Sequence, residues 1–116
     1  MFGSMGSPAA SAPANEVQAA VTFTPSAAGA LTAASAALPA GAVGTPVRVE
    51  AFGSVGSYVS LTTTGQQQII ATVAPNGNPT TKAIPAQAFP GKVNSVQIGG
   101  YASGAGVVIA LVTFRL

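Results

Sequence analysis

The sequence lacks cysteine, histidine, aspartate and tryptophan altogether. Without cysteine it has no disulfide, no thiolate nucleophile and no Cys-ligated metal site, and without histidine it lacks the usual proton acceptor at neutral pH. Glu16 and Glu50 are its only acidic side chains, so a hydrolase built on paired carboxylates has no residue to spare. These absences predict a protein that is not an enzyme and has no cofactor, no metal ion and no small-molecule substrate.

Charge of either sign is scarce. Charged residues make up 5% of the 116 residues, against about 25% in an ordinary soluble domain. The formal net charge is +2, and the cations are scattered singly along the chain: Arg48, Lys82, Lys92 and Arg115. Nucleic-acid binding requires clustered Lys and Arg residues that neutralise several phosphates. The sequence therefore argues against a nucleic-acid partner.

Three explanations for so few charges are a membrane protein, a low-complexity disordered chain and a subunit covered by its neighbours. The apolar run at residues 105–114 is about half as long as a spanning helix, and Pro39 interrupts the weakly apolar stretch 27–44. The first residues lack the basic and apolar parts of a signal peptide, so secretion by that route is not expected. Disordered chains combine low hydrophobicity with high net charge, and this chain has neither. A covered subunit remains, which predicts a homo-oligomer or many copies bound on a lattice.

Short alternating segments separated by Gly- and Pro-rich turns predict an all-β fold. In residues 46–53, for example, Val47, Val49 and Ala51 share one face. The candidate strands are residues 16–24, 30–38, 46–53, 57–63, 66–73, 82–89, 92–98 and 107–114. We expect a single-domain β-sandwich over residues 16–116, jelly-roll or immunoglobulin-like with seven or eight strands. A flexible N-terminal arm at residues 1–15 precedes it.

Some segments also indicate their place in the sheets. The run 107–114 is apolar almost throughout, which is typical of a central strand covered on both faces. Pro85 favours an edge position for residues 82–89. The Ala-rich residues 30–38 form either a weak edge strand or an irregular segment.

Three connections carry turn signals. Asn76-Gly77, between two prolines, is the strongest, because this pair tolerates the positive φ of tight turns. Residues 53–56 have the spacing of a hairpin turn. The glycine-rich residues 99–106 resemble a phosphate loop, but β-branched residues follow them and no Lys lies nearby. A bulged hairpin is the better interpretation.

Four residues of the predicted sandwich are candidate subunit contacts. Arg48 and Glu50 share one face of a strand, either as a charge pair that docks a partner or as part of a solvated face. Phe52 follows on the same face and is a candidate exposed aromatic residue. Arg115, beside the C-terminus, is placed to make an ionic contact with an adjacent chain, which would set registry more than affinity.

The N-terminal arm supplies further candidate contacts. Met1, Phe2 and Met5 are apolar residues within a segment of Gly, Ser, Ala and Pro. We expect the arm to become ordered against an adjacent subunit. Tyr58 and Tyr101 are additional candidate exposed aromatics, and aromatic platforms are used by carbohydrate-binding modules, although usually with tryptophan.

From Pro46 onward the sequence resembles small all-β proteins found with tailed-phage head genes. The resemblance rests on Val47-Arg48-Val49 before a small-residue turn, Tyr58-Val59-Ser60-Leu61, Ile84-Pro85-Ala86 before a further turn, and the closing run at residues 107–112. These are short and compositionally common pieces, and the first 45 residues do not follow the pattern.

The resemblance implies a virion structural protein, assembled in the host cytoplasm. Its function would be that of a capsid decoration or cement protein that binds and stabilises a phage head, with the major capsid protein as partner. The alternatives are a carbohydrate- or receptor-binding module of a tail or fibre, another minor head or tail subunit, or the shell subunit of a small capsid.

Overall fold

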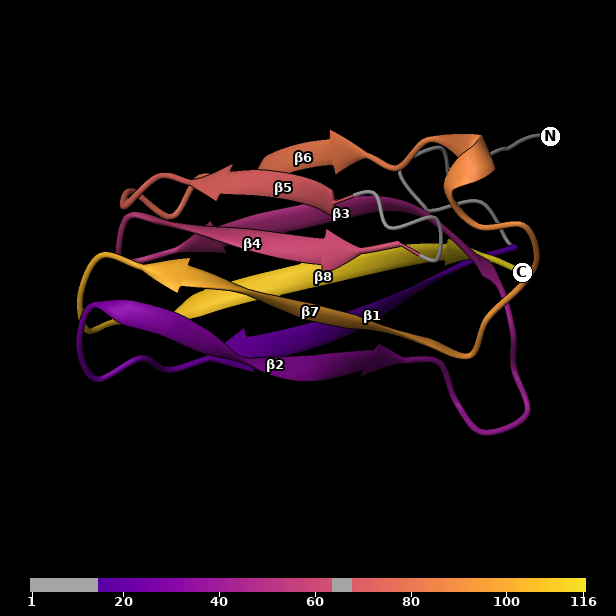
Figure 1. Cartoon of the computed structure of the whole chain (residues 1–116), viewed down its shortest axis with the longest axis horizontal. Helices are drawn as coiled ribbons and strands as arrows, with labels where there is room; N and C mark the ends of the chain where they lie inside the picture. Colours follow the sequence, from indigo (N-terminus) through magenta and orange to yellow (C-terminus); the bar gives the residue numbers. More distant parts are fainter. Residues whose placement is uncertain (1–14, 64–67) are drawn as a thin grey trace, which may run out of the picture.

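The computed structural model describes residues 15–63 and 68–116, which form eight strands and one short 3-10 helix. The strands run along the long axis of the molecule (Figure 1). Their bounds are β1 Glu16–Phe23, β2 Gly29–Ala37, β3 Thr45–Gly53, β4 Ser57–Thr62, β5 Gln68–Val73, β6 Thr80–Ala83, β7 Ser95–Ala102 and β8 Val108–Arg115, and the 3-10 helix η1 is Ala86–Ala88. The predicted all-β fold is confirmed.

The strands form two antiparallel four-stranded sheets with the orders β1-β8-β3-β6 and β2-β7-β4-β5. The pairing brings the first strand to the last, the second to the seventh, the third to the sixth and the fourth to the fifth. This is a long antiparallel ribbon rolled up so that β8 also pairs with β3 and β7 with β4. An immunoglobulin-like domain would pair β1 with β2, so the strand order decides for the jelly roll.

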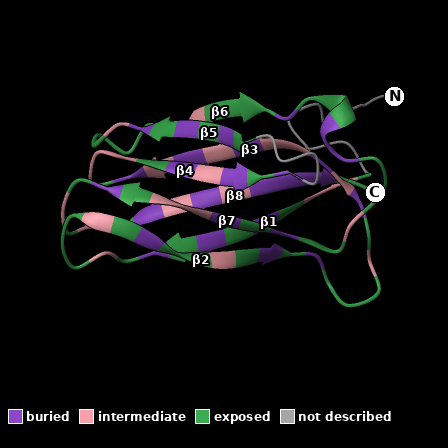
Figure 2. Ribbon diagram, viewed as in Figure 1, coloured by how far each residue is buried: buried purple, intermediate pink, exposed green. Residues whose placement is uncertain are grey.

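Alternating burial along the strands creates one core between the sheets (Figure 2). In β1 the side chains of Ala19, Val21 and Phe23 are buried while their neighbours are exposed. β8 is central, as its apolar run predicts, and Val108 and Phe114 are fully buried. Most core residues are Val, Ala, Leu or Ile, and the β-branched Val and Ile among them pack well on pleated surfaces.

One predicted core residue is displaced. The pairing of β3 with β8 shifts its register between Pro46 and Arg48. Pro46 lies opposite Phe114 and is fully buried, whereas Val47 is only half-buried. The extra residue of such a bulge leaves the alternation for one position, so the expectation that Val47 shares the core face of Val49 is wrong.

The two predicted hairpins are instead corners between the sheets. Residues 54–56 connect β3 to β4, and residues 103–107 connect β7 to β8, and each pair of strands belongs to different sheets. The backbone N–H of Ser54 donates to the carbonyl of Val107 at 3.0 Å, and the Ser54 hydroxyl accepts from the N–H of Val107 at 3.0 Å. These bonds join the two corners, and the chain crosses the sandwich at both.

Other local predictions are confirmed. Gly77 has a φ of 78°, and the N–H of Asn78 donates to the Asn76 side chain at 3.0 Å, so Asn76-Gly77 forms the expected turn. β2 and β6 are edge strands. Two strands differ from the prediction. The strand predicted at residues 82–89 is shorter and lies earlier, since β6 ends at Ala83 and η1 follows Pro85. The strand predicted at residues 92–98 lies later, since β7 begins at Ser95 and runs on through Gly99 and Gly100.

Within the described ranges, no helix is long and apolar enough to cross a membrane. Met1, Phe2 and Met5, together with the arm apart from residue 15, lie outside the described residues.

Candidate interaction surface

The fold brings the four candidate contact residues of the sandwich onto a single surface. Arg48, Glu50 and Phe52 alternate with the buried residues of β3, and Arg115 lies outward at the end of β8. We call this outer face of the β1-β8-β3-β6 sheet the charged face. The register places the following side chains on it: Glu16, Gln18, Ala20, Thr22, Arg48, Glu50, Phe52, Thr81, Ile109, Leu111, Thr113 and Arg115.

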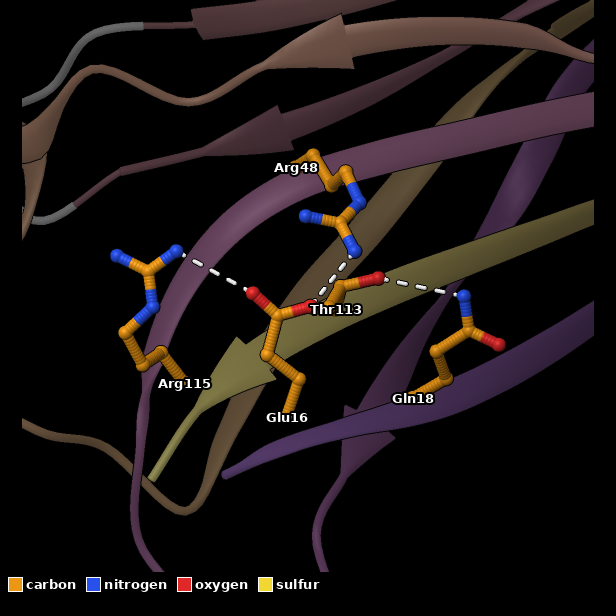
Figure 3. A network of polar contacts seen from close by, with 5 residues as sticks. All are labelled: Glu16, Gln18, Arg48, Thr113 and Arg115. Atoms are coloured by element: carbon orange, nitrogen blue, oxygen red, sulfur yellow. Dashed lines mark hydrogen bonds and ion pairs between the residues drawn. The ribbon is translucent and has the colours of Figure 1, made fainter. Parts of the chain in front are cut away.

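An ion-pair cluster centred on Glu16 occupies one end of the charged face (Figure 3). One Nη of Arg48 donates to Glu16 Oε1 at 2.8 Å, and one Nη of Arg115 donates to Glu16 Oε2 at 3.2 Å. The side chain of Glu16 is 4% exposed, whereas those of Arg48 and Arg115 are 38% and 56% exposed. The carboxylate is therefore enclosed by two guanidinium groups that still reach solvent.

Strand pairing explains how the three groups meet. Glu16 begins β1 opposite Arg115 of β8, and Arg48 of β3 pairs with Thr113 on the other side of β8. The hydrogen bond from Arg48 holds the pKa of Glu16 below its usual value of 4.5, with Arg115 adding to the effect and desolvation opposing it. The cluster is thus ionised at neutral pH.

Polar contacts extend along the face. Gln18 Nε2 donates to Thr113 Oγ1 at 3.4 Å, and Thr113 is buried although it lies on an outer face. The Thr81 hydroxyl donates to Glu50 Oε2 at 3.5 Å. Arg48 is bonded to Glu16, which lies on the strand beyond β8. Whether Arg48 and Glu50 dock a partner stays a prediction.

An apolar patch extends from the middle of the charged face to the end away from the ion cluster. Phe52 lies opposite Ile109 at that end, and Leu111 lies opposite Glu50 and Ala20 in the middle. The side chains of Phe52, Ile109 and Leu111 are each half-buried by their neighbours. An apolar patch with Arg side chains on the same face is the composition of a protein–protein contact surface. Ile109 and Leu111 were not identified in the sequence, because a continuous apolar strand gives no indication of which residues point outward.

The outer face of the β2-β7-β4-β5 sheet has no charged residue on any of its strands. We call it the uncharged face. Tyr58 of β4 and Tyr101 of β7 are directly opposite each other on it. Their ring centroids are 6.3 Å apart and their planes are 17° from parallel.

Neither face assembles a group of metal-ligating side chains: across residues 15–63 and 68–116, no three acidic, His or Cys residues cluster. Comparison with protein-family models, curated proteins and solved structures finds no match to this chain.

Proposed function

We propose that this chain is a non-enzymatic structural protein of a virion, a decoration or cement protein that attaches to a phage head through its charged face. The observation that carries the proposal is the apolar patch of Phe52, Ile109 and Leu111 on the same face as an ion cluster in which the carboxylate of Glu16 is paired. The resemblance of residues 46–116 to phage head-associated proteins supports the choice of a phage head as the partner.

The energetics favour docking of this face. Burial of apolar surface contributes about 25 cal/mol per Å2. Covering Phe52, Ile109 and Leu111 therefore offsets part of the entropy lost on association. Burying a lone carboxylate would oppose docking, but Glu16 is already enclosed and paired with Arg48 and Arg115. A partner that covers this end of the face therefore does not strip water from an unpaired carboxylate.

Attachment in many copies would supply the remaining affinity. A weak contact repeated over a lattice becomes strong by avidity when the copies also touch one another. Charged residues make up only 5% of the chain, which agrees with a subunit that works while surrounded by neighbours. Jelly rolls occur in viral capsid domains and in lectin domains, so the fold by itself does not choose between them.

The test is binding of the purified chain to phage heads assembled without it, measured by co-sedimentation. We expect saturable binding by the wild type and at least a tenfold weaker association for Phe52→Ser, about 1.4 kcal/mol. The matched control is Ile70→Ser, which removes an exposed apolar side chain from the uncharged face and should leave head binding unchanged.

Two results would contradict the proposal. The first is a wild-type chain that never sediments with heads and stays monomeric at millimolar concentration. The second is equal loss of binding in the Phe52 and Ile70 variants, because it would show that the charged face has no special part in attachment.

A further inference from the structure

The uncharged face carries a pair of aromatic rings that the proposed head contact does not use. Tyr58 and Tyr101 are 40% and 44% exposed, and they lie side by side on the two central strands, β4 and β7, one residue from the end of each. Their rings are nearly parallel at a centroid separation of 6.3 Å. The pairing of β4 with β7 fixes this arrangement, so the two rings are in place before any ligand arrives.

Small and hydroxyl-bearing residues surround the rings. Thr72 of β5 lies opposite Tyr58, and Ser60 of β4 lies opposite Gly99 of β7, two residues before Tyr101. A Cβ added at Gly99 would meet only ordinary van der Waals contacts, with Ala33 at 3.8 Å, so glycine leaves the backbone without a covering side chain beside the rings. Gln97, further along β7, donates to the Ser35 hydroxyl at 2.7 Å and presents an amide on the same face.

We propose that the uncharged face binds a neutral oligosaccharide at Tyr58 and Tyr101. The C–H groups on one face of a pyranose ring are weakly positive and pack against the negative faces of aromatic rings. Hydroxyl groups of the sugar would exchange hydrogen bonds with Ser60, Thr72 and the phenol oxygens, all of which can both donate and accept. The absence of a side chain at Gly99 lets a sugar ring approach the backbone there.

Charge complementarity selects this occupant. No Lys, Arg or Glu lies on β2, β4, β5 or β7, so an anionic or cationic ligand would lose hydration without gaining an ionic partner. A protein partner of ordinary kind brings charged side chains that meet the same cost. A neutral ligand rich in hydroxyl groups loses little, because the face offers hydroxyl and amide partners in return.

The chain contains its own reporter for this site. It has two tyrosines and no tryptophan, and both tyrosines belong to the ring pair. Intrinsic fluorescence of the purified full-length protein therefore reports on the proposed site alone. The probes are the neutral hexasaccharides of glucose in α-1,4 and β-1,4 linkage, of β-1,4-mannose and of β-1,4-N-acetylglucosamine, with a sialylated and a sulfated oligosaccharide as charged comparators.

We expect at least one neutral hexasaccharide to change the tyrosine fluorescence saturably, and the charged comparators to leave it unchanged. Calorimetric titration of the same sugar into Tyr58→Ala and Tyr101→Ala should give affinities five- to tenfold weaker, the effect of losing one aromatic contact. Gly99→Leu adds a large side chain beside the rings at a position where a Cβ meets no clash, and it should block the site. Phe52→Leu, on the opposite sheet, should bind as the wild type does.

The failing results are equally definite. The inference is overturned if none of the neutral probes binds, if only a charged comparator binds, or if Tyr58→Ala, Tyr101→Ala and Gly99→Leu all bind like the wild type while circular dichroism shows them folded. Association with another protein through Tyr58 and Tyr101, without sugar binding, would also overturn it. These outcomes are independent of head binding, because the head contact lies on the other sheet.

Discussion

The two sheets of this jelly roll share one core but present different surfaces. Of the six charged residues in the chain, five lie on strands of the β1-β8-β3-β6 sheet, none lies on the other sheet, and Lys92 lies in the connection that follows η1. The strand residues are Glu16, Arg48, Glu50, Lys82 and Arg115. An average charge of 5% therefore conceals a molecule with one polar side and one uncharged side.

This difference indicates two kinds of contact. On the charged face, the carboxylate of Glu16 is already paired with Arg48 and Arg115, so a protein partner meets an apolar patch and a cluster with one arginine charge in excess. On the uncharged face, Tyr58 and Tyr101 offer ring surface and hydroxyl groups without any ionic group. A lattice subunit with both surfaces could hold a shell on one side and present the other outward.

The largest effect should come from breaking the core that the sheets share. Phe114 of β8 is fully buried opposite Val17 and Pro46. We expect Phe114→Ala to lower the free energy of unfolding by about 3–5 kcal/mol, through lost burial and the cavity that remains. Urea titration followed by circular dichroism measures it.

The matched control for that substitution is Phe52→Ala on the outer face of the same sheet. Phe52 is half-buried, so its truncation should cost much less. Equal losses of stability in the two variants would contradict the view that the core between the sheets, and not the outer face, stabilises the fold.

The next largest effect on stability is expected at one of two neighbouring glycines of the β2-β7-β4-β5 sheet. Gly100 has a φ of 151°, and a Cβ there would collide with the Tyr58 carbonyl oxygen. Gly100→Ala should destabilise by about 3 kcal/mol or more, or prevent folding. Gly99→Ala should change stability by less than about 1 kcal/mol, because its Cβ has space. Thermal melting of the two variants decides, and similar melting temperatures would show that β7 is not held closely against β4.

Much of the fold could be predicted from local patterns. Alternation located the strands, Pro85 indicated an edge, and the apolar run at residues 107–114 indicated the centre of a sheet. The corners at residues 54–56 and 103–107 could not be distinguished from hairpins. Turn chemistry is local, whereas the choice of sheet depends on partners elsewhere in the chain, such as Ser54 and Val107.

The candidate sites were predicted only in part, for the same reason. The sequence indicates Arg48 and Arg115 as candidate contacts. Their common partner Glu16 lies 32 positions from Arg48 and 99 positions from Arg115, so the sequence does not show that the three meet. Tyr58 and Tyr101 were noticed as separate aromatics, and only the pairing of β4 with β7 makes them neighbours. Residue type could be read from the sequence, but the register that brings the residues together could not.

A new charge on each face should affect a different ligand. Leu111→Lys places an ammonium group in the apolar patch of the charged face. Thr72→Lys places one opposite Tyr58 on the uncharged face. We expect Leu111→Lys to weaken head binding about tenfold and leave sugar binding intact, and Thr72→Lys to do the reverse, because an ammonium group loses its hydration when a ligand covers it.

Co-sedimentation with heads and calorimetry with the hexasaccharide give the two readouts for both variants. If either substitution impaired both activities in a folded protein, the assignment of head binding to the charged face and sugar binding to the uncharged face would be wrong. If each impaired only its own, the asymmetry of charge would be established as a functional one.

The smallest effect concerns acid stability within the charged face. Because Arg48 and Arg115 lower the pKa of Glu16 in the folded state, the ionised carboxylate stabilises the fold above its usual pKa of 4.5. That contribution is lost as the pH falls from about 4.5 through the lower folded-state pKa. Glu16→Gln should therefore lower the melting temperature at pH 7, and its difference from the wild type should shrink below pH 4.5.

Glu50→Gln is the matched control for this pH dependence, because Glu50 accepts only a 3.5 Å contact from Thr81 in the described residues. It should lower the melting temperature at pH 7 less than Glu16→Gln does. Melting curves recorded from pH 7 to pH 3 test both substitutions. A Glu16→Gln variant that stays below the wild type by the same margin at every pH would show that the Glu16 side chain acts through packing rather than through its charge.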